Sequence, residues 1–156
     1  MSLAGTAQGV DSYILFSVAG TTYALPSREV RHMEMIEGIT RVPNAPAFID
    51  GVVFSRGQVV PALNLRARFG FERAPYDLSS RLLVVHAAGR SVGLVVDAAR
   101  EFVSLDPATI QPPNAALTGL SGRYLEGVAN IGDRLILVLD LAEALTFSDP
   151  VLETHS

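Results

Sequence analysis

The carboxylates of this 156-residue chain are spread along the sequence instead of being gathered in pairs. Hydrolysis by paired carboxylates would need two of them about 5–10 Å apart in one cleft. Most of the acids instead lie in predicted turns or at the starts of predicted helices, as do Asp11, Asp50, Asp106, Asp133, Glu29 and Asp140. Acidic side chains at such positions form turns and cap helices. We therefore expect structural roles for them and no catalytic residue.

The sequence gives little support to nucleophilic, cofactor or metal chemistry. There is no cysteine, which excludes disulfides, thiolate nucleophiles and cysteine-ligated zinc. All 12 basic residues are arginine, so a lysine Schiff base and a phosphate-loop lysine are excluded as well. The three histidines, His32, His86 and His155, are widely spaced, and serine-hydrolase and dinucleotide signatures are lacking. We expect no cofactor and no metal site.

Arg56 has the position best suited to recognition, at the tip of a predicted hairpin. In the simplest interpretation, the sequence Ser55–Arg56–Gly57 is only a tight turn between two apolar strands. A guanidinium group at a hairpin tip is also well placed for a bidentate contact with a partner. The local sequence leaves both interpretations open.

Short strands separated by turn residues account for most of the chain. Runs of β-branched and aromatic residues predict strands over residues 12–18, 22–25, 51–54, 58–62, 81–87, 91–96, 99–105, 125–130 and 134–139. Short helices are predicted over residues 28–35, 63–69 and 141–145, with Ser27 and Asp140 as caps of the first and the last. Residues 106–123 are rich in proline and glycine, and we expect little regular structure there.

This pattern favours an all-β sandwich or barrel with short helices. Hydrophobic residues make up 49% of the chain and charged residues 18%, which is too apolar for a disordered protein. The apolar runs are far shorter than the ~20 residues that cross a bilayer, and a net charge of −4 gives no reason to bind nucleic acid. We expect a cytoplasmic protein without membrane insertion, with a flexible leader over residues 1–11 and a flexible tail over residues 147–156.

The chain contains an internal repeat, with its copies 76 positions apart. Residues 50–65 read DGVVFSRGQVVPALNL, and residues 126–141 read EGVANIGDRLILVLDL. Upstream, residues 20–25 resemble residues 89–94. A hairpin, a proline-rich segment, a second hairpin and a short helix thus occur twice in the same order, which indicates a duplication.

Two copies predict two subdomains, each built around a small twisted barrel. We place the first at about residues 20–80 and the second at about residues 81–140, with segments 12–19 and 141–146 crossing between them. So small a barrel has only a thin core, and the two should therefore pack on each other. The groove between them is then a natural site for a helix of another protein.

The segment over residues 39–65, ITRVPNAPAFIDGVVFSRGQVVPALNL, resembles the signature of the CheW-like chemotaxis coupling proteins. Further similar blocks are YALP at residues 23–26, VGLVVD at 92–97, YLEG at 124–127 and GDR at 132–134. The resemblance covers about residues 13–145. Several separate blocks follow one another in the family's order, which makes the resemblance specific.

The resemblance implies two SH3-like five-stranded β-barrel subdomains on a shared core, and a stand-alone scaffold without enzymatic activity. Proteins of this family couple the cytoplasmic tips of chemoreceptors to a chemotaxis histidine kinase. The receptor tip is expected to dock in the groove between the barrels. The kinase regulatory domain, itself of similar fold, is expected to pack edge to edge against a barrel. The implied location is the cytoplasm, with recruitment to receptor arrays.

The resemblance also implies a set of partner-binding positions. The corresponding positions in this chain are Val30, His32, Phe54, Arg56, Gly57, Val95, Val96 and Asp97. Val30 and His32 fall on the helix predicted over residues 28–35, Arg56 matches the arginine of the family's Arg–Gly turn, and residues 95–97 match a strand edge near the groove.

The sequence departs from the family pattern at three places. Glutamate is common where His32 stands, Asn–Leu where Phe54–Ser55 stands, and aspartate where Asn64 stands. These differences leave the cognate kinase and receptor open, and a pathway that controls pili is an alternative output. Two other classes also stay open. A small enzyme or ligand-binding domain would need a pocket of several hundred Å³, and a structural domain would associate only with itself.

Overall fold

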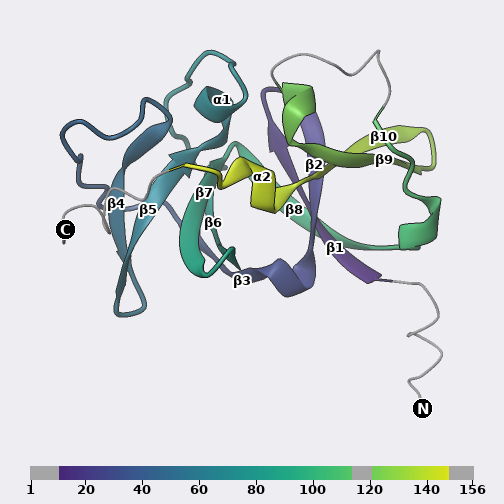
Figure 1. Cartoon of the computed structure of the whole chain (residues 1–156), viewed down its shortest axis with the longest axis horizontal. Coiled ribbons are helices and arrows are strands. Elements are labelled where there is room, and N and C mark those ends of the chain that lie inside the picture. The colour runs from purple at the N-terminus through teal and green to yellow at the C-terminus, as the bar shows by residue number, and fades with distance from the viewer. Residues whose placement is uncertain (1–10, 114–120, 148–156) are drawn as a thin grey trace.

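The alternating strand pattern of the sequence builds two five-stranded sheets (Figure 1). A computed structural model describes residues 11–113 and 121–147. Its strands are β1 (Asp11–Val18), β2 (Thr21–Pro26), β3 (Val30–Met35), β4 (Ile49–Ser55), β5 (Gln58–Asn64), β6 (Arg81–Ala87), β7 (Arg90–Val96), β8 (Ala98–Leu105), β9 (Leu125–Ile131) and β10 (Arg134–Leu139). Its helices, all short, are η2 (Ser27–Glu29), α1 (Leu65–Arg68), η3 (Pro107–Thr109), η5 (Ser121–Tyr124) and α2 (Leu141–Ala144). None of these helices could span a bilayer.

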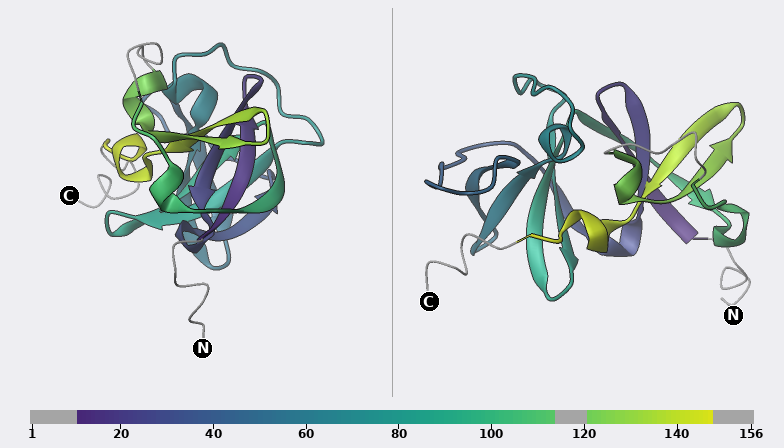
Figure 2. Two further views of the ribbon diagram at one scale, coloured as in Figure 1. Left: turned by 90° about the vertical axis from the view of Figure 1, so that its right-hand side faces the viewer. Right: turned by 45° about the horizontal axis from the view of Figure 1, so that its top comes forward.

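Each sheet consists of two hairpins and one edge strand. Sheet A has the order β8-β1-β2-β10-β9, and sheet B has the order β3-β6-β7-β5-β4. Neighbouring strands are antiparallel, except that β2 runs parallel to β10 and β7 parallel to β5. Figure 1 places sheet B on the left and sheet A on the right, with α2 between them, and Figure 2 shows the same separation from another side.

The two sheets are copies of one architecture, as the repeat predicts. Each strand of sheet A can be replaced by the strand five places further along the chain, counting on from β10 to β1. The order of sheet A then becomes the order of sheet B. Irregular contacts recur as well. Thr40 exchanges two backbone hydrogen bonds of 2.8 and 2.9 Å with Val52, and Gln111 exchanges two of 2.7 and 2.9 Å with Val128, 76 positions after Val52. The duplication therefore extends from the strand order to single hydrogen bonds.

The boundaries predicted for the two subdomains, about 20–80 and 81–140, do not match the sheets. Sheet B contains residues 30–96, whereas sheet A joins residues 11–26 to residues 98–139. The reason is that the first hairpin of each copy pairs with a strand of the other copy. Strand β2 runs parallel to β10, and β7 runs parallel to β5. Sequence similarity locates the two copies of the repeat, but it does not show this exchange of hairpins between them.

The prediction of a helix over residues 28–35 is wrong. Only η2 is helical, and the residues that follow form β3, which pairs antiparallel with β6. Along β3, partly buried and exposed side chains alternate with a period of two, as in a strand. Val30 and Met33 also fit a helical spacing, and the pairing with β6, about fifty residues further along the chain, decides the outcome.

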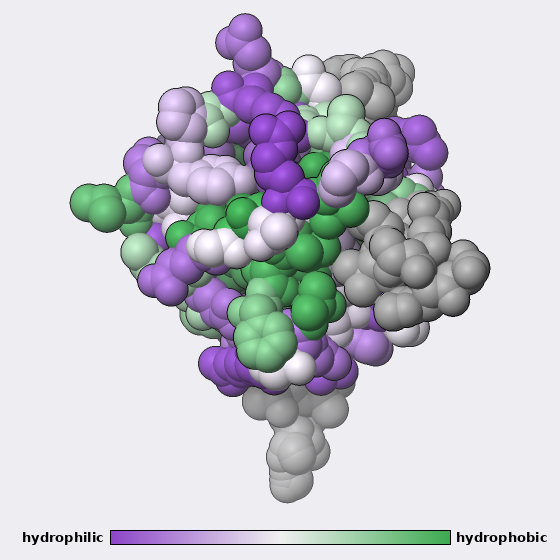
Figure 3. Space-filling view, turned by 90° about the vertical axis from the view of Figure 1, so that its left-hand side faces the viewer, coloured by the Kyte–Doolittle hydropathy of each residue, from purple (hydrophilic) through white to green (hydrophobic). Residues whose placement is uncertain are grey.

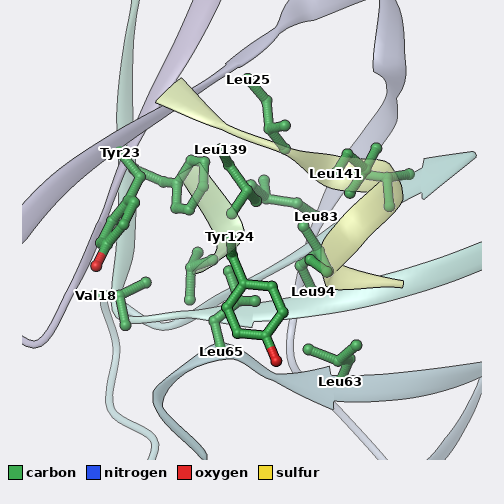
Figure 4. Packing of buried hydrophobic residues seen from close by; sticks show 14 of the residues in the cluster. Val18, Tyr23, Leu25, Leu63, Leu65, Leu83, Leu94, Tyr124, Leu139 and Leu141 are labelled. Carbon is green, nitrogen blue, oxygen red and sulfur yellow. The ribbon is translucent and has the colours of Figure 1, made fainter. Parts of the chain in front are cut away.

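Apolar side chains from both sheets form one shared core between them (Figure 4). The labelled members are Val18, Tyr23, Leu25, Leu63, Leu65, Leu83, Leu94, Tyr124, Leu139 and Leu141. A smaller cluster lies inside each sheet. Val60 and Ala62 belong to the one in sheet B, and Ile136 and Val138 occupy the equivalent places in sheet A. The fold class is thus confirmed as all-β with short helices and two small barrels on a common core.

The segment after α2 ties the two sheets together. Asp140 caps α2, as predicted, by accepting a hydrogen bond of 3.1 Å from the backbone of Glu143. The Arg68 guanidinium donates to the carbonyl of Ala144, the last residue of the helix, at 3.1 Å, and beyond the helix that of Arg90 donates to the carbonyl of Phe147 at 2.8 Å. The Arg90 guanidinium also lies 4.2 Å from the centre of the Phe147 ring, a cation–π distance.

Candidate partner-binding surface

Arg56 and Gly57 form the tight turn that closes the β4–β5 hairpin. Both have positive φ angles, +49° and +83°, and such angles are unusual for a residue other than glycine. The side chain of Arg56 is exposed. The turn therefore presents a guanidinium group to solvent at the end of two strands, which is the placement the sequence predicts for a recognition residue.

Exposed apolar side chains flank this turn. Phe54 on β4 pairs with Val59 on β5, and their side chains are 75% and 49% exposed. Met33 and Met35 on β3 are also exposed. We call Met33, Met35, Phe54, Arg56 and Val59 the β3–β4 surface. Figure 3 views the molecule from the side on which β4 and β5 lie and shows apolar surface gathered at the centre of that face. Aromatic, methionine and arginine side chains are enriched in the cores of protein interfaces.

Strands β3 and β4 meet through side chains, although they stand at opposite ends of the order in sheet B. The Nε2 atom of His32 lies 2.9 Å from the Oγ atom of Ser55, and that hydroxyl donates a 2.6 Å hydrogen bond to Glu34. The Ser55 residue is only 4% exposed. Sheet B therefore curls into a barrel until its edges touch. The side chains that close it are His32, Glu34 and Ser55, which we call the polar seam.

The polar seam does not have the geometry of a hydrolytic triad. In such a triad the imidazole contacts the serine through one ring nitrogen and the carboxylate through the other. Here Nε2 of His32 lies within hydrogen-bond distance of both Ser55 and Glu34, at 2.9 and 2.7 Å. Because the serine hydroxyl already donates to Glu34, the imidazole is not placed to relay its proton. The seam is a structural cluster and does not activate a nucleophile.

Three of the other predicted positions are part of the core or border it. Val30 begins β3 and packs against the shared core. Val95 and Val96 are buried, and their strand β7 lies at the centre of sheet B. The prediction that residues 95–97 form a strand edge is therefore wrong, because β6 and β5 cover both sides of β7. A buried side chain on a central strand cannot touch a partner directly, so we leave Val95 and Val96 out of the docking surface.

Asp97 has an internal role between the two sheets. Its carboxylate accepts a 2.8 Å hydrogen bond from Arg66 of α1 and another of 2.8 Å from the backbone of Ala19 in the β1–β2 turn. The hydrogen bond to Asp97 is the main cause that raises the pKa of Arg66. Asp97 thus holds a hairpin of sheet A against the helix that follows β5.

A surface cavity of about 890 Å³ lies between the segments 39–50 and 73–76. It has the size that a ligand-binding domain would need. Its carboxylate, Asp50, already accepts hydrogen bonds from Arg73, Tyr76 and Asn64. Burial, followed by the hydrogen bond to Asp50, raises the pKa of Tyr76. These polar groups are directed at one another, which argues against a reactive centre in the cavity.

The sequence prediction of the site missed Met33, Met35, Val59 and the partners of His32. The sequence pattern predicts a helix at these two methionines. A helical interpretation does not use the two-residue alternation that marks a strand. The contact between His32 and Ser55 joins residues 23 positions apart that share no backbone pairing. Within β3 the period-two alternation was the available signal, since it places Met33 and Met35 on the face opposite His32.

Comparison with known proteins shows which family the chain as a whole resembles. A family model described as the CheW-like domain matches residues 12–148. The chemotaxis protein CheW of Klebsiella aerogenes is 31% identical, with 98% of this chain and 95% of that protein covered. Protein FrzA of Myxococcus xanthus is 29% identical over 72% of this chain and 70% of its own. The crystal structure of the scaffolding protein TtCheW from Thermoanaerobacter tengcongensis superimposes with a TM-score of 0.81 and 30% identity, covering 88% of this chain and 94% of that one.

Proposed function

The chain belongs to the CheW-like family, and on that basis we propose that it is a non-enzymatic scaffold coupling chemoreceptors to a chemotaxis histidine kinase. The similar chain from Thermoanaerobacter tengcongensis is described as a scaffolding protein, and several relatives are named chemotaxis proteins. In this proposal the protein works in the cytoplasm and is recruited to arrays of receptors.

The observation that carries the proposal is that exposed apolar residues recur at equivalent positions of the two barrels. Met33 and Val59 on sheet B correspond to Phe102 and Leu135 on sheet A, through the same strand pairings. All four side chains are between 42% and 64% exposed. A scaffold must hold more than one partner at once, and exposed apolar surfaces on both barrels, in addition to the groove between them, offer separate places for docking on one shared core.

We assign the β3–β4 surface to the regulatory domain of the kinase. Phe54 supplies an aromatic anchor and Arg56 a charge-assisted donor, which are the residue types that dominate interface energetics. The receptor tip is assigned to the groove between the barrels. Each contact is modest, and an array that repeats many of them gains avidity.

Replacing Arg56 with glutamate and Phe54 with serine tests this assignment. Each change is expected to weaken co-sedimentation with the kinase regulatory domain and to leave the circular dichroism spectrum unchanged, since both side chains are exposed. Leu78→Ser is the matched control, because Leu78 is 86% exposed and lies outside the β3–β4 surface. Kinase binding that survives both changes would remove this surface from the site.

The output of the pathway is a separate question. Deleting the gene and scoring swimming and twitching independently would distinguish flagellar control from control of pili. Sedimentation of the isolated chain would reveal a domain that associates only with itself, because such a chain would form oligomers without any partner.

A further inference from the structure

The two barrels close in chemically different ways. In sheet B, the seam between β3 and β4 consists of His32, Glu34 and Ser55. The strand pairings place Val103 at the equivalent of Glu34, and Ile131 at the equivalent of Ser55. Both are partly buried and pack against the apolar cluster inside sheet A. The equivalent of His32 is Glu101, which pairs with Arg134 at 3.2 Å, so sheet A closes without the imidazole and the hydroxyl of the polar seam.

The hydrogen bonds of the polar seam depend on where its protons lie. Ser55 donates its proton to Glu34, and Nε2 of His32 faces the same carboxylate at 2.7 Å. An unprotonated Nε2 at that distance would place its lone pair next to the negatively charged oxygen of Glu34, and the two would repel each other. We therefore assign a proton to Nε2. A second proton, at Nδ1, would convert a neutral donor into a cation beside a carboxylate. Histidine is the side chain that ordinarily changes charge between pH 5 and 8.

Within residues 11–113 and 121–147, few other charged groups face His32, since its neighbour Arg31 is exposed on the opposite face of β3. Along β6, the residues paired with Val30 to Glu34 are apolar, from Leu82 to Val85. Arg81 stands opposite Met35 and donates to the carbonyls of Leu78 and Ser80. On β4, Ser55 is followed by the exposed Arg56 in the turn. Glu34 is therefore the charged group that faces the imidazole directly.

We propose that His32, Glu34 and Ser55 form a proton-sensitive latch that sets the shape of the β3–β4 surface. Met33 lies between His32 and Glu34, and Phe54 directly precedes Ser55, so the residues of the latch alternate with those that point outward. Protonation of the imidazole makes its hydrogen bond to Ser55, which crosses from β3 to β4, charge-assisted, and thereby fixes the outward side chains. The role of the latch in regulating docking rests on the function proposed above. The response of the latch to protons does not depend on that function.

Methionine-methyl NMR of the whole chain tests the latch without any partner. The sequence has only three methionines, Met1, Met33 and Met35, so two of the three methyl signals report on β3. Between pH 8 and 5.5, both are expected to shift along one common titration curve. His32→Gln keeps a donor but cannot gain a charge, and it should abolish the shift. His86→Gln is the matched control, because His86 also contacts a serine, at 3.1 Å, and should leave the shift intact.

Methyl signals that stay constant with pH, or a titration that persists in His32→Gln, would overturn the latch. In a second arm, binding of the purified kinase regulatory domain is measured at pH 8 and pH 5.5. We expect binding about fivefold tighter at the lower pH, the lower end of typical coupling between sites, and no such difference for His32→Gln. Equal affinity at both pH values would contradict regulation of docking. Absence of binding at either pH would contradict the proposed function, while the methyl titration still decides the latch.

Discussion

Asn64 and Asp140, 76 positions apart, occupy the same place in the two copies of one structural unit. Each donates its backbone N–H to the carbonyl of an aromatic residue, Phe48 at 2.8 Å and Tyr124 at 2.7 Å. The side-chain oxygen of each accepts a hydrogen bond from the third residue of the helix that follows, at 3.2 and 3.1 Å. One polar residue thus ends a strand and begins a short helix in each half.

The two caps are expected to contribute unequally to stability. Asp140→Ala should cost about 1 kcal/mol of unfolding free energy, the usual value for a lost helix cap. Asn64→Ala should cost about 2 kcal/mol, since Asn64 also donates a 2.9 Å hydrogen bond to Asp50. Urea unfolding measures both, with Asp140→Asn as the control that keeps a capping oxygen. An Asp140→Ala variant as stable as the parent would contradict this role.

Gly51 is predicted to be the glycine least tolerant of a side chain. Its φ is +149°, and a Cβ atom there would lie 2.2 Å from the carbonyl oxygen of Thr40. Gly51→Ala should therefore cost about 3 kcal/mol, by adding backbone strain to overpacking. Gly20→Ala serves as the control, because Gly20 has a φ of +82° with open space around it and should cost about 1 kcal/mol. Equal losses in thermal unfolding would show that the contact with Thr40 does not matter.

Glu29 is predicted to make stability fall as the pH rises. Burial, followed by repulsion from Glu126 and Asp140, raises the pKa of Glu29 above its ordinary value of 4.5, against the opposing effect of Arg28. The folded state then holds this proton more tightly than the unfolded state, so its contribution is favourable at low pH and is lost as the pH rises through the folded pKa.

Glu29→Gln removes that titration. The variant should unfold at a higher temperature than the parent at pH 7, by a margin worth less than about 1 kcal/mol because the side chain is partly exposed. At pH 4, where the carboxyl of the parent is largely protonated, the two proteins should be equally stable. Thermal unfolding at both pH values checks the prediction, and a variant that is less stable at pH 7 would refute it.

Local patterns predicted most of the fold. The hairpins β4–β5, β6–β7 and β9–β10 were evident because their turns contain glycine and their strands are apolar, and the repeat revealed the duplication. The sequence could not show that β2 pairs with β10 and β7 with β5, because parallel pairing between distant strands leaves no local signal. The same limit hid β3, whose six residues become a strand by pairing with β6.

The candidate site was partly predictable for a related reason. The turn at Arg56 and the exposed Phe54 depend on local sequence, and the structure places both on the surface. The burial of Val95 and Val96 depends on the neighbours of β7, which are set by sheet order. Contacts between edges of a closed barrel, such as that of His32 with Ser55, require the three-dimensional fold.

Co-sedimentation of the kinase with receptor-bearing membranes tests the coupling role most directly. With the chain present, the account predicts that the kinase pellets with the membranes, and that Phe54→Ser leaves most of it in the supernatant while the variant itself stays folded. Leu78→Ser should behave like the parent protein. A kinase that pellets to the same extent whether or not the chain is added would contradict the account.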